Sequence, residues 1–174
     1  MSEEPGPIID LRSDDHFMAE ALRQARKAYE QGEVPVGAVV VREGRIIARA
    51  FNQVELLKDA TAHAEMLALT SAQSAVGDWR LTDCDVYVTK EPCPMCAGAL
   101  YHCRVRRLIF GCPSPKDGAC GSLLNLLDQP TLNHRAVIRG LVRQDECSGL
   151  LRQFFLEARR SATPGGEDEP GRLN

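Results

Sequence analysis

The chain has 174 residues, enough for one domain with a buried core, and its apolar content of 44% is typical of a soluble globular protein. Its longest apolar run, residues 34–41, is far shorter than the roughly 20 residues that cross a bilayer, which argues against a membrane protein. The acidic N-terminus lacks the basic and apolar regions of a signal peptide, and the seven cysteines are an odd number, so we expect a cytoplasmic protein with reduced thiols.

The net charge of −3 is distributed unevenly along the chain. The first 15 residues sum to −4 and the last 14 to −2, which leaves the body between them at +3. A mildly basic body permits contact with nucleic acid but does not require it, because binding to phosphates depends on clustered Lys and Arg side chains.

The N-terminal part of the chain predicts a disordered arm, a helix and a hairpin. Residues 1–12 contain prolines, a glycine and scattered acids, a composition typical of disorder. Ser13 is a suitable N-cap for an amphipathic helix that would end near Gly32. Two runs rich in β-branched residues, 36–41 and 45–50, surround a turn and predict a β-hairpin.

The rest of the chain alternates between helical and strand patterns. In order, the sequence predicts a polar loop at 51–61, a helix at 63–74, a strand at 84–89, a helix at 94–102, a strand at 105–110, a Gly/Pro-rich loop at 111–121, a short helix at 122–127, a strand at 136–142, a helix at 145–160 and a flexible tail at 161–174. The expected inner face of the last helix consists of Leu150, Leu151, Phe154, Phe155 and Ala158. This order favours one α/β domain over residues 13–160, a three-layer α/β/α sandwich whose mixed sheet has about five strands.

Two cysteines form the first chemical motif. Cys93 and Cys96 are three residues apart, so on a helix both thiols lie on one face and can bind one ion. Pro94 is suited to the first helical position, which leaves Cys93 at the cap, where the positive end of the helix favours thiolate. The pair alone is a weak signal, because redox motifs and structural zinc sites share it.

A second motif lies about thirty residues upstream, where His63 and Glu65 open a predicted helix. His-x-Glu followed by Pro-Cys-x-x-Cys is the signature of zinc-dependent nucleobase deaminases. One His and two Cys leave a tetrahedral Zn²⁺ with one position open for water, as in catalytic zinc sites. Glu65 could then move protons as base and acid, a role typically worth roughly 10²- to 10⁴-fold in rate. Side chains two apart on a regular helix diverge, so His63 and Glu65 converge only if the helix begins there.

Other readings of these residues stay open on sequence alone. The two cysteines could form a redox pair, His63 could be an ordinary histidine and Glu65 a solvated helical residue. A structural zinc would need a fourth ligand, for which the candidates are Cys84, His102, Cys103, Cys112, Cys120, His134 and Cys147.

Over residues 34–160 the chain resembles the bacterial tRNA-specific adenosine deaminases. The stretches that carry the resemblance are residues 33–38, 61–65, 91–99, 121–123 and 133–135. The resemblance implies a cytidine-deaminase-like fold, a homodimer with one Zn²⁺ per subunit, and hydrolytic conversion of adenosine to inosine at the first anticodon position, arginine tRNA being the expected substrate.

The resemblance also implies contacts with the substrate. Asn52 would hydrogen-bond the flipped base, Val34 would pack against it, and the backbone N–H near Ala64 would face it. The residues expected near flanking nucleotides or a phosphate are Lys116, Asn133, His134, Phe155 and Arg159. Each has an ordinary alternative: Phe155 as core, Arg159 as a solvated helix end, and Asn133 with His134 as a turn.

Three positions depart from the family's pattern. Ser114 stands where many members have Asp, Lys90 replaces a usually apolar residue, and Cys103 replaces a common Ser. Ser114 matters most, because its loop is expected to touch the nucleic acid backbone, and the loss of an acid there could extend the substrates to DNA or an atypical RNA.

Three functional hypotheses follow. The first is a deaminase of the tRNA wobble adenosine. The second is a deaminase of a free base or nucleoside, such as cytosine, cytidine or guanine, which would need a pocket closed around a small ligand. The third, a zinc-stabilised RNA-binding module without catalysis, conflicts with the presence of Glu65.

Overall fold

The structure, a computed structural model, describes residues 10–162. Its helices are α1 (Asp14–Glu30), α2 (Val54–Leu57), α3 (Ala64–Val76), α4 (Pro94–His102) and α5 (Gln144–Ala162), and its strands are β1 (Gly37–Arg42), β2 (Arg45–Phe51), β3 (Cys84–Lys90), β4 (Arg107–Cys112) and β5 (Val137–Arg139). The predicted arm at residues 1–12 and tail at 161–174 lie mainly outside the described range. Within it, residues 11–12 form a turn and Ser161 is still helical.

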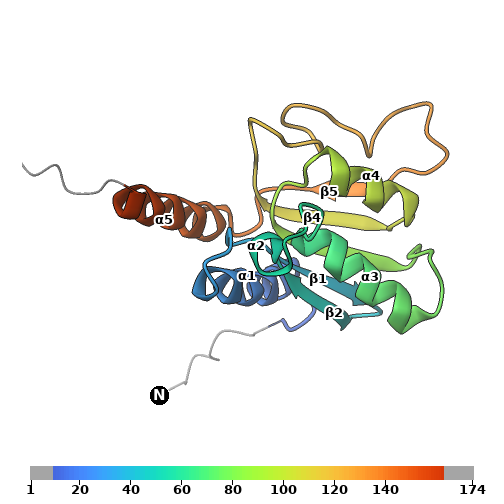
Figure 1. Ribbon diagram of the computed structural model, residues 1–174. Helices are drawn as coiled ribbons and strands as arrows, with labels where there is room; N and C mark the ends of the chain where they lie inside the picture. The colour runs from blue at the N-terminus through green and yellow to red at the C-terminus, as the bar shows by residue number, and fades with distance from the viewer. Residues whose placement is uncertain (1–9, 163–174) are drawn as a thin grey trace, which may run out of the picture.

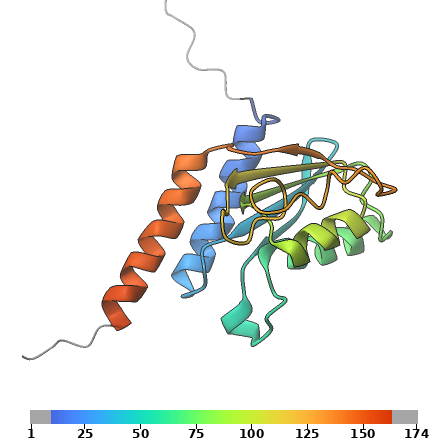
Figure 2. The same ribbon diagram turned by 90° about the horizontal axis from the view of Figure 1, so that it is seen from above.

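The five strands form one mixed sheet in the order β2-β1-β3-β4-β5. β1 is antiparallel to both of its neighbours, whereas β3, β4 and β5 run parallel. Helices α1 and α5 cover one face of the sheet, and α3 and α4 cover the other (Figures 1 and 2). The predicted three-layer α/β/α sandwich is therefore confirmed.

Alternation along the strands explains the two cores. In β1, Val39 and Val41 pack in the core beneath α1, whereas Ala38 and Val40 pack in the core beneath α3 and α4. Successive side chains of a strand point to opposite faces, and both faces of this sheet are covered, so the whole run is buried. None of the helices within residues 10–162 combines the length and apolarity needed to traverse a bilayer.

Local capping explains where the helices begin. The Ser13 hydroxyl accepts a hydrogen bond from the His16 N–H at 3.1 Å, which starts α1 as predicted. His63 and Cys93 have extended backbone conformations and serve as the N-caps of α3 and α4, with Pro94 in the first turn of α4. β2 and β3 run in the same direction, so the helices that follow them both begin at the same edge of the sheet.

Several expected elements differ from the structure. The predicted helix at 122–127 is wrong: Cys120 forms an isolated bridge with Asn125, and the backbone turns back on itself. The Ser122 hydroxyl and N–H both donate to the Glu91 carboxylate, which holds this segment against the end of β3. The last strand spans only Val137–Arg139, and the predicted loop at 51–61 contains the short helix α2.

The predicted inner face of α5 is correct only for its first half. Cys147 is buried and Leu151 is partly buried against the cores, but Phe155 is 44% exposed and Ala158 lies in an exposed stretch. Phe154 contacts the Tyr29 ring of α1 with a centroid distance of 5.7 Å. Beyond this contact α5 extends past the body of the domain (Figure 1), so its last turns have no sheet to pack on.

Candidate active site

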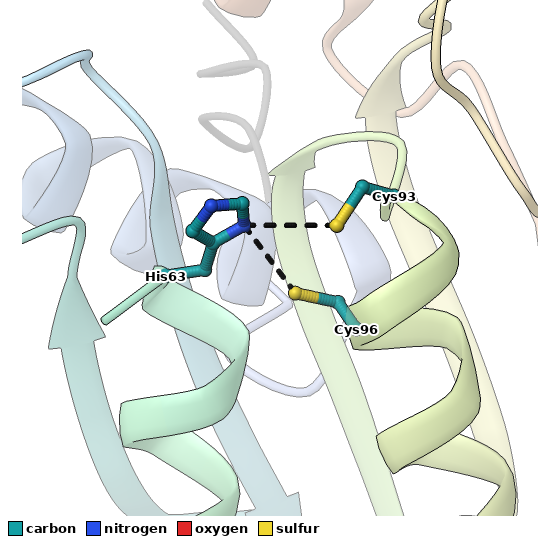
Figure 3. A group of neighbouring side chains, drawn as sticks. All are labelled: His63, Cys93 and Cys96. Atoms are coloured by element: carbon teal, nitrogen blue, oxygen red, sulfur yellow. Dashed lines mark hydrogen bonds between the residues drawn. The ribbon is translucent and has the colours of Figure 1, made fainter. Parts of the chain in front are cut away.

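Three ligand-type side chains meet where α3 and α4 begin. The Nδ1 atom of His63 lies 3.7 Å from the Cys93 Sγ and 3.5 Å from the Cys96 Sγ (Figure 3). All three ligand atoms lie within 4.8 Å of one another, and no fourth His, Cys, Asp or Glu among residues 10–162 joins the group. The closed structural site considered from the sequence therefore finds no support in this part of the chain.

The three side chains of the cluster shift one another's pKa values. Hydrogen bonds from Cys96 and His63 lower the pKa of Cys93 to about 4, so it is a thiolate at neutral pH. The hydrogen bond to Cys93, together with burial, raises the pKa of Cys96, and the bond to Cys93 raises that of His63. One imidazole and two sulfurs match the ligand preferences of Zn²⁺, and metal binding would release the protons that the cluster holds.

Glu65 lies beside this cluster in the first turn of α3. The side chain is 4% exposed, and burial raises the pKa of its carboxyl group. His63 is the non-helical cap and Glu65 is in the first turn, so both side chains line the same pocket, as the sequence requires. A buried carboxyl group with a raised pKa can accept and return a proton near neutral pH.

A pocket with a volume of about 520 Å³ opens at this site. Its wall consists of Gly32, Glu33, Val34, Val36, Asn52, Val54, Glu55, His63, Glu65, Lys90, Glu91, Cys93, Asp117, Phe154 and Phe155. The structure thus brings together, in one cavity, three of the expected substrate contacts, Val34, Asn52 and Phe155, with the cluster and Glu65. Cys96 and Ala64 lie buried behind this wall.

Within residues 10–162, the other expected contacts do not line this pocket. Lys116 is exposed in the loop after β4, and Arg159 lies in the exposed last turns of α5. The His134 Nε2 atom is 2.7 Å from the carbonyl oxygen of Val105, just before β4. Asn133 and His134 therefore lie toward the opposite end of β4 from the cluster in the same chain.

Glu91 is a site residue whose role was not predicted. Its side chain is 1% exposed, and it accepts hydrogen bonds from the N–H groups of Ser114, Cys120 and Ser122 at 2.9, 3.1 and 2.9 Å. Burial opposes ionisation, but these bonds and that from the Ser122 hydroxyl hold the pKa of Glu91 below its usual range. Glu91 thereby fixes the loop after β4 against Cys93. An acid directly before the Pro-Cys pair was the available signal.

The departures at Lys90 and Ser114 are connected in the structure. The Lys90 Nζ atom lies 3.1 Å from a carboxylate oxygen of Asp117, and the Ser114 hydroxyl also donates to Asp117. Lys90 and Asp117 both line the pocket. An acidic residue thus lies three residues after Ser114, paired with the cation at position 90.

The fold and this site together define a zinc-dependent deaminase. Residues 11–112 match the cytidine and deoxycytidylate deaminase zinc-binding region. The chain is 48% identical to a tRNA-specific adenosine deaminase of Bacillus subtilis over 86% of this chain and 93% of that protein, and 48% identical to one of Aquifex aeolicus over 84% and 97%.

A solved structure from studies of A-to-I editing by tRNA deaminases at the wobble position superimposes with a TM-score of 0.75. It is 44% identical and covers 78% of this chain and 98% of its own. The chain belongs to the tRNA-specific adenosine deaminase family.

Proposed function

We propose that the chain converts adenosine to inosine at the wobble position of a tRNA anticodon. The observation that carries the proposal is the buried Glu65 beside a three-ligand cluster, in a pocket whose wall includes Phe155 with 44% of its surface exposed. A deaminase of free bases or nucleosides would need the pocket closed around its ligand, whereas an exposed aromatic side chain at the wall suits a neighbouring nucleotide of a polymer. A non-catalytic module would have no use for Glu65 at this position.

His63, Cys93 and Cys96 would hold the zinc ion. When bound, zinc supplies a Lewis-acidic fourth position at which water becomes acidic enough to act near neutral pH. His63 and Cys93 line the pocket where the starts of α3 and α4 meet, so a metal held by the three residues would lie beside the pocket.

Glu65 would move the protons of the reaction. Its carboxylate takes a proton from the attacking water, passes it to a ring nitrogen of adenine, and then helps to protonate the amine as the C–N bond breaks. The overall balance is adenosine plus water giving inosine plus ammonia. Burial of Glu65 excludes bulk water and keeps the proton within the site.

Contacts with the target base come from other residues of the pocket and from the start of α3. Val34 packs against the base, Asn52 hydrogen-bonds its edge, and Phe155 meets a neighbouring nucleotide. The Ala64 N–H, in the first turn of α3, is available to the base. The remaining expected contacts are assigned to nucleotides beyond the target base: Lys116, Asn133, His134 and Arg159.

A homodimer fits the placement of these outer residues. Asn133 and His134 lie far from the pocket of their own chain, so in a dimer they would serve the pocket of the partner. The exposed apolar side chains Leu123 and Leu124, 58% and 46% exposed, support an interface near the loop after β4. The proposed substrate is a tRNA, with arginine tRNA as the expected one. Such a substrate agrees with a cytoplasmic location.

The test is a substrate panel with zinc-loaded protein. An arginine tRNA transcript with adenosine at the wobble position is incubated in parallel with cytosine, cytidine, adenosine and guanine, and inosine and ammonia are measured. Conversion of the transcript alone supports the proposal, whereas turnover of the small compounds alone contradicts it. A DNA stem-loop of the same sequence tests whether Ser114 extends the substrate range.

A further inference from the structure

We propose that Glu33 is a positioning residue that holds the side-chain amide of Asn52 in a single orientation and so determines the hydrogen-bond pattern offered to the substrate base. This inference rests on the proposed function, because it takes Asn52 to contact that base. Glu33 itself acts through Asn52 and takes no part in the proton transfers assigned to Glu65.

The contacts of the Glu33 carboxylate are all with N–H donors. Its Oε2 atom accepts from the Asn52 Nδ2 at 3.3 Å and from the Glu55 N–H at 3.2 Å, and its Oε1 atom accepts from the Leu56 N–H at 2.6 Å. Glu33 is 1% exposed and Asn52 is 7% exposed, so water competes little for these bonds. Glu33 therefore joins the turn after α1 to both Asn52 and α2.

The chemistry of the two groups fixes the amide. An ionised carboxylate only accepts hydrogen bonds, whereas the Asn amide has a donor side and an acceptor side. A flipped Asn52 would set its oxygen against the Glu33 oxygen, leaving two buried acceptors without a proton between them. One N–H of Asn52 is thus used by Glu33, and the oxygen and the second N–H keep defined places.

The backbone around both residues is anchored separately. The Glu33 N–H donates to the Ala28 carbonyl at 2.9 Å, and the Asn52 N–H donates to the Val36 carbonyl at 2.9 Å. Glu33 therefore restrains two groups, the side-chain amide of Asn52 and the first turn of α2. Asn52 lines the pocket together with Val34 and Glu65, so the orientation of its amide bears directly on which base edge fits.

A double-mutant cycle tests the assignment. Single-turnover rates and KM are measured for the wild type, Glu33→Gln, Asn52→Ala and the double variant on an RNA stem-loop with wobble adenosine, with zinc content and Tm as controls. Gln keeps the size of Glu33 but places an NH₂ group among N–H donors. We expect Glu33→Gln to lose about tenfold in kcat/KM, mainly through KM, as for one lost charge-assisted hydrogen bond.

The decisive comparison is the double variant. If Glu33 acts through Asn52, the double variant loses no more activity than Asn52→Ala alone, because the group that Glu33 positions is already absent. Losses that multiply in the double variant, or a Glu33→Gln variant with wild-type kinetics, would overturn the assignment. A merely structural role would lower Tm and activity in both backgrounds alike.

The free protein offers a second, independent measurement. In ¹⁵N-labelled wild-type protein, the Asn52 side-chain resonances are assigned by their loss in Asn52→Ala. We expect one amide proton to be shifted downfield and to exchange slowly with solvent, whereas a rapidly exchanging Asn52 amide would refute the proposal even if Glu33→Gln failed to fold. If the wild type does not convert RNA, the proposed function fails while this spectrum still decides the role of Glu33.

Discussion

The two ends of the central sheet differ in the partners that surround their acidic side chains. At the amino ends of β3 and β4, the Asp14 carboxylate accepts from the Tyr87 hydroxyl at 2.7 Å and from Arg107 at 2.9 Å. Asp85 accepts from Arg106 at 2.8 and 2.9 Å and from Arg107 at 3.2 Å. The half-buried Asp14 and the buried Asp85 thus both have cationic or hydroxyl donors from the chain itself.

At the carboxyl end of β3 the balance is different. Cys93 is a thiolate, Cys96 is buried, and the carboxyl group of Glu65 is buried beside them with a raised pKa. Cys96 and His63 both form hydrogen bonds that favour the Cys93 thiolate, and the bond to Cys93 raises the pKa of His63. Titratable ligand-type groups that shift one another's pKa values are typical of a functional site, whereas carboxylates paired with arginine and hydroxyl donors are typical of a site that stabilises the fold.

The largest effect is expected when one of the three zinc ligands is removed. Cys96→Ala should lose zinc and abolish deamination, because two ligands cannot retain a catalytic ion. Elemental analysis and inosine formation measure the two effects. Cys84→Ala, at an equally buried cysteine outside the cluster, is the matched control and should keep both. Full zinc content in Cys96→Ala would contradict the ligand set.

Removing the proton carrier should separate metal binding from catalysis. Glu65→Gln keeps the size of the side chain and retains His63, Cys93 and Cys96, so zinc and folding should be retained. The rate should fall by roughly 10²- to 10⁴-fold, because no other group takes up the proton of water. Single-turnover inosine formation with zinc determination on the same sample measures this. A variant with the parent rate would refute the assignment.

A variant of Glu91 tests whether a buried carboxylate at the carboxyl end of β3 can stabilise the fold. Glu91→Gln replaces an acceptor of four hydrogen bonds with an amide, so it should lower the free energy of unfolding by about 1–3 kcal/mol. Denaturant unfolding of the zinc-loaded protein measures the change. Glu43→Gln, at an exposed turn residue, is the control and should be neutral. Unchanged stability of Glu91→Gln would show that the loop after β4 is held by other contacts.

The far end of the sheet should show the smallest effect, confined to stability and low pH. Burial opposes ionisation of Asp14, but Tyr87 and Arg107 hold its pKa below the ordinary value of 3.8. Its contribution is therefore complete above the unfolded pKa and is lost as the pH falls through the folded pKa. Asp14→Asn should lower stability at neutral pH by about 1 kcal/mol and weaken its dependence on acid pH, without affecting deamination at neutral pH. Equal acid sensitivity of both proteins would contradict this.

Local signals were enough to predict most elements and the centre of the site. The Ser13 cap, Pro94 at the start of α4 and the alternating strand patterns depend on neighbouring residues only, so the sequence reveals them directly. The meeting of His63 with the cysteines followed from the paired motif and from the resemblance to the deaminase family.

What the sequence did not predict depends on contacts between distant residues. Glu33 stabilises the first turn of α2 from 22 and 23 residues away, and Glu91 binds Ser122 from 31 residues away. The second contact lies at the start of the segment 122–127, where the predicted helix is replaced by turns and the bridge between Cys120 and Asn125. The exposed end of α5 was missed for a similar reason, since an amphipathic pattern shows that a face is apolar but not what covers it.

Deamination in H₂¹⁸O tests directly whether the site hydrolyses adenosine with water and with the help of Glu65. Zinc-loaded protein is incubated with an arginine tRNA stem-loop bearing wobble adenosine, and the mass of the product nucleoside is measured by mass spectrometry. A parallel reaction contains the Glu65→Gln variant. We predict that the wild type forms inosine at the wobble position and that this inosine carries one ¹⁸O atom from solvent. With Glu65→Gln it should be nearly absent. Unlabelled inosine, or no inosine from a protein shown to hold zinc, would contradict this prediction.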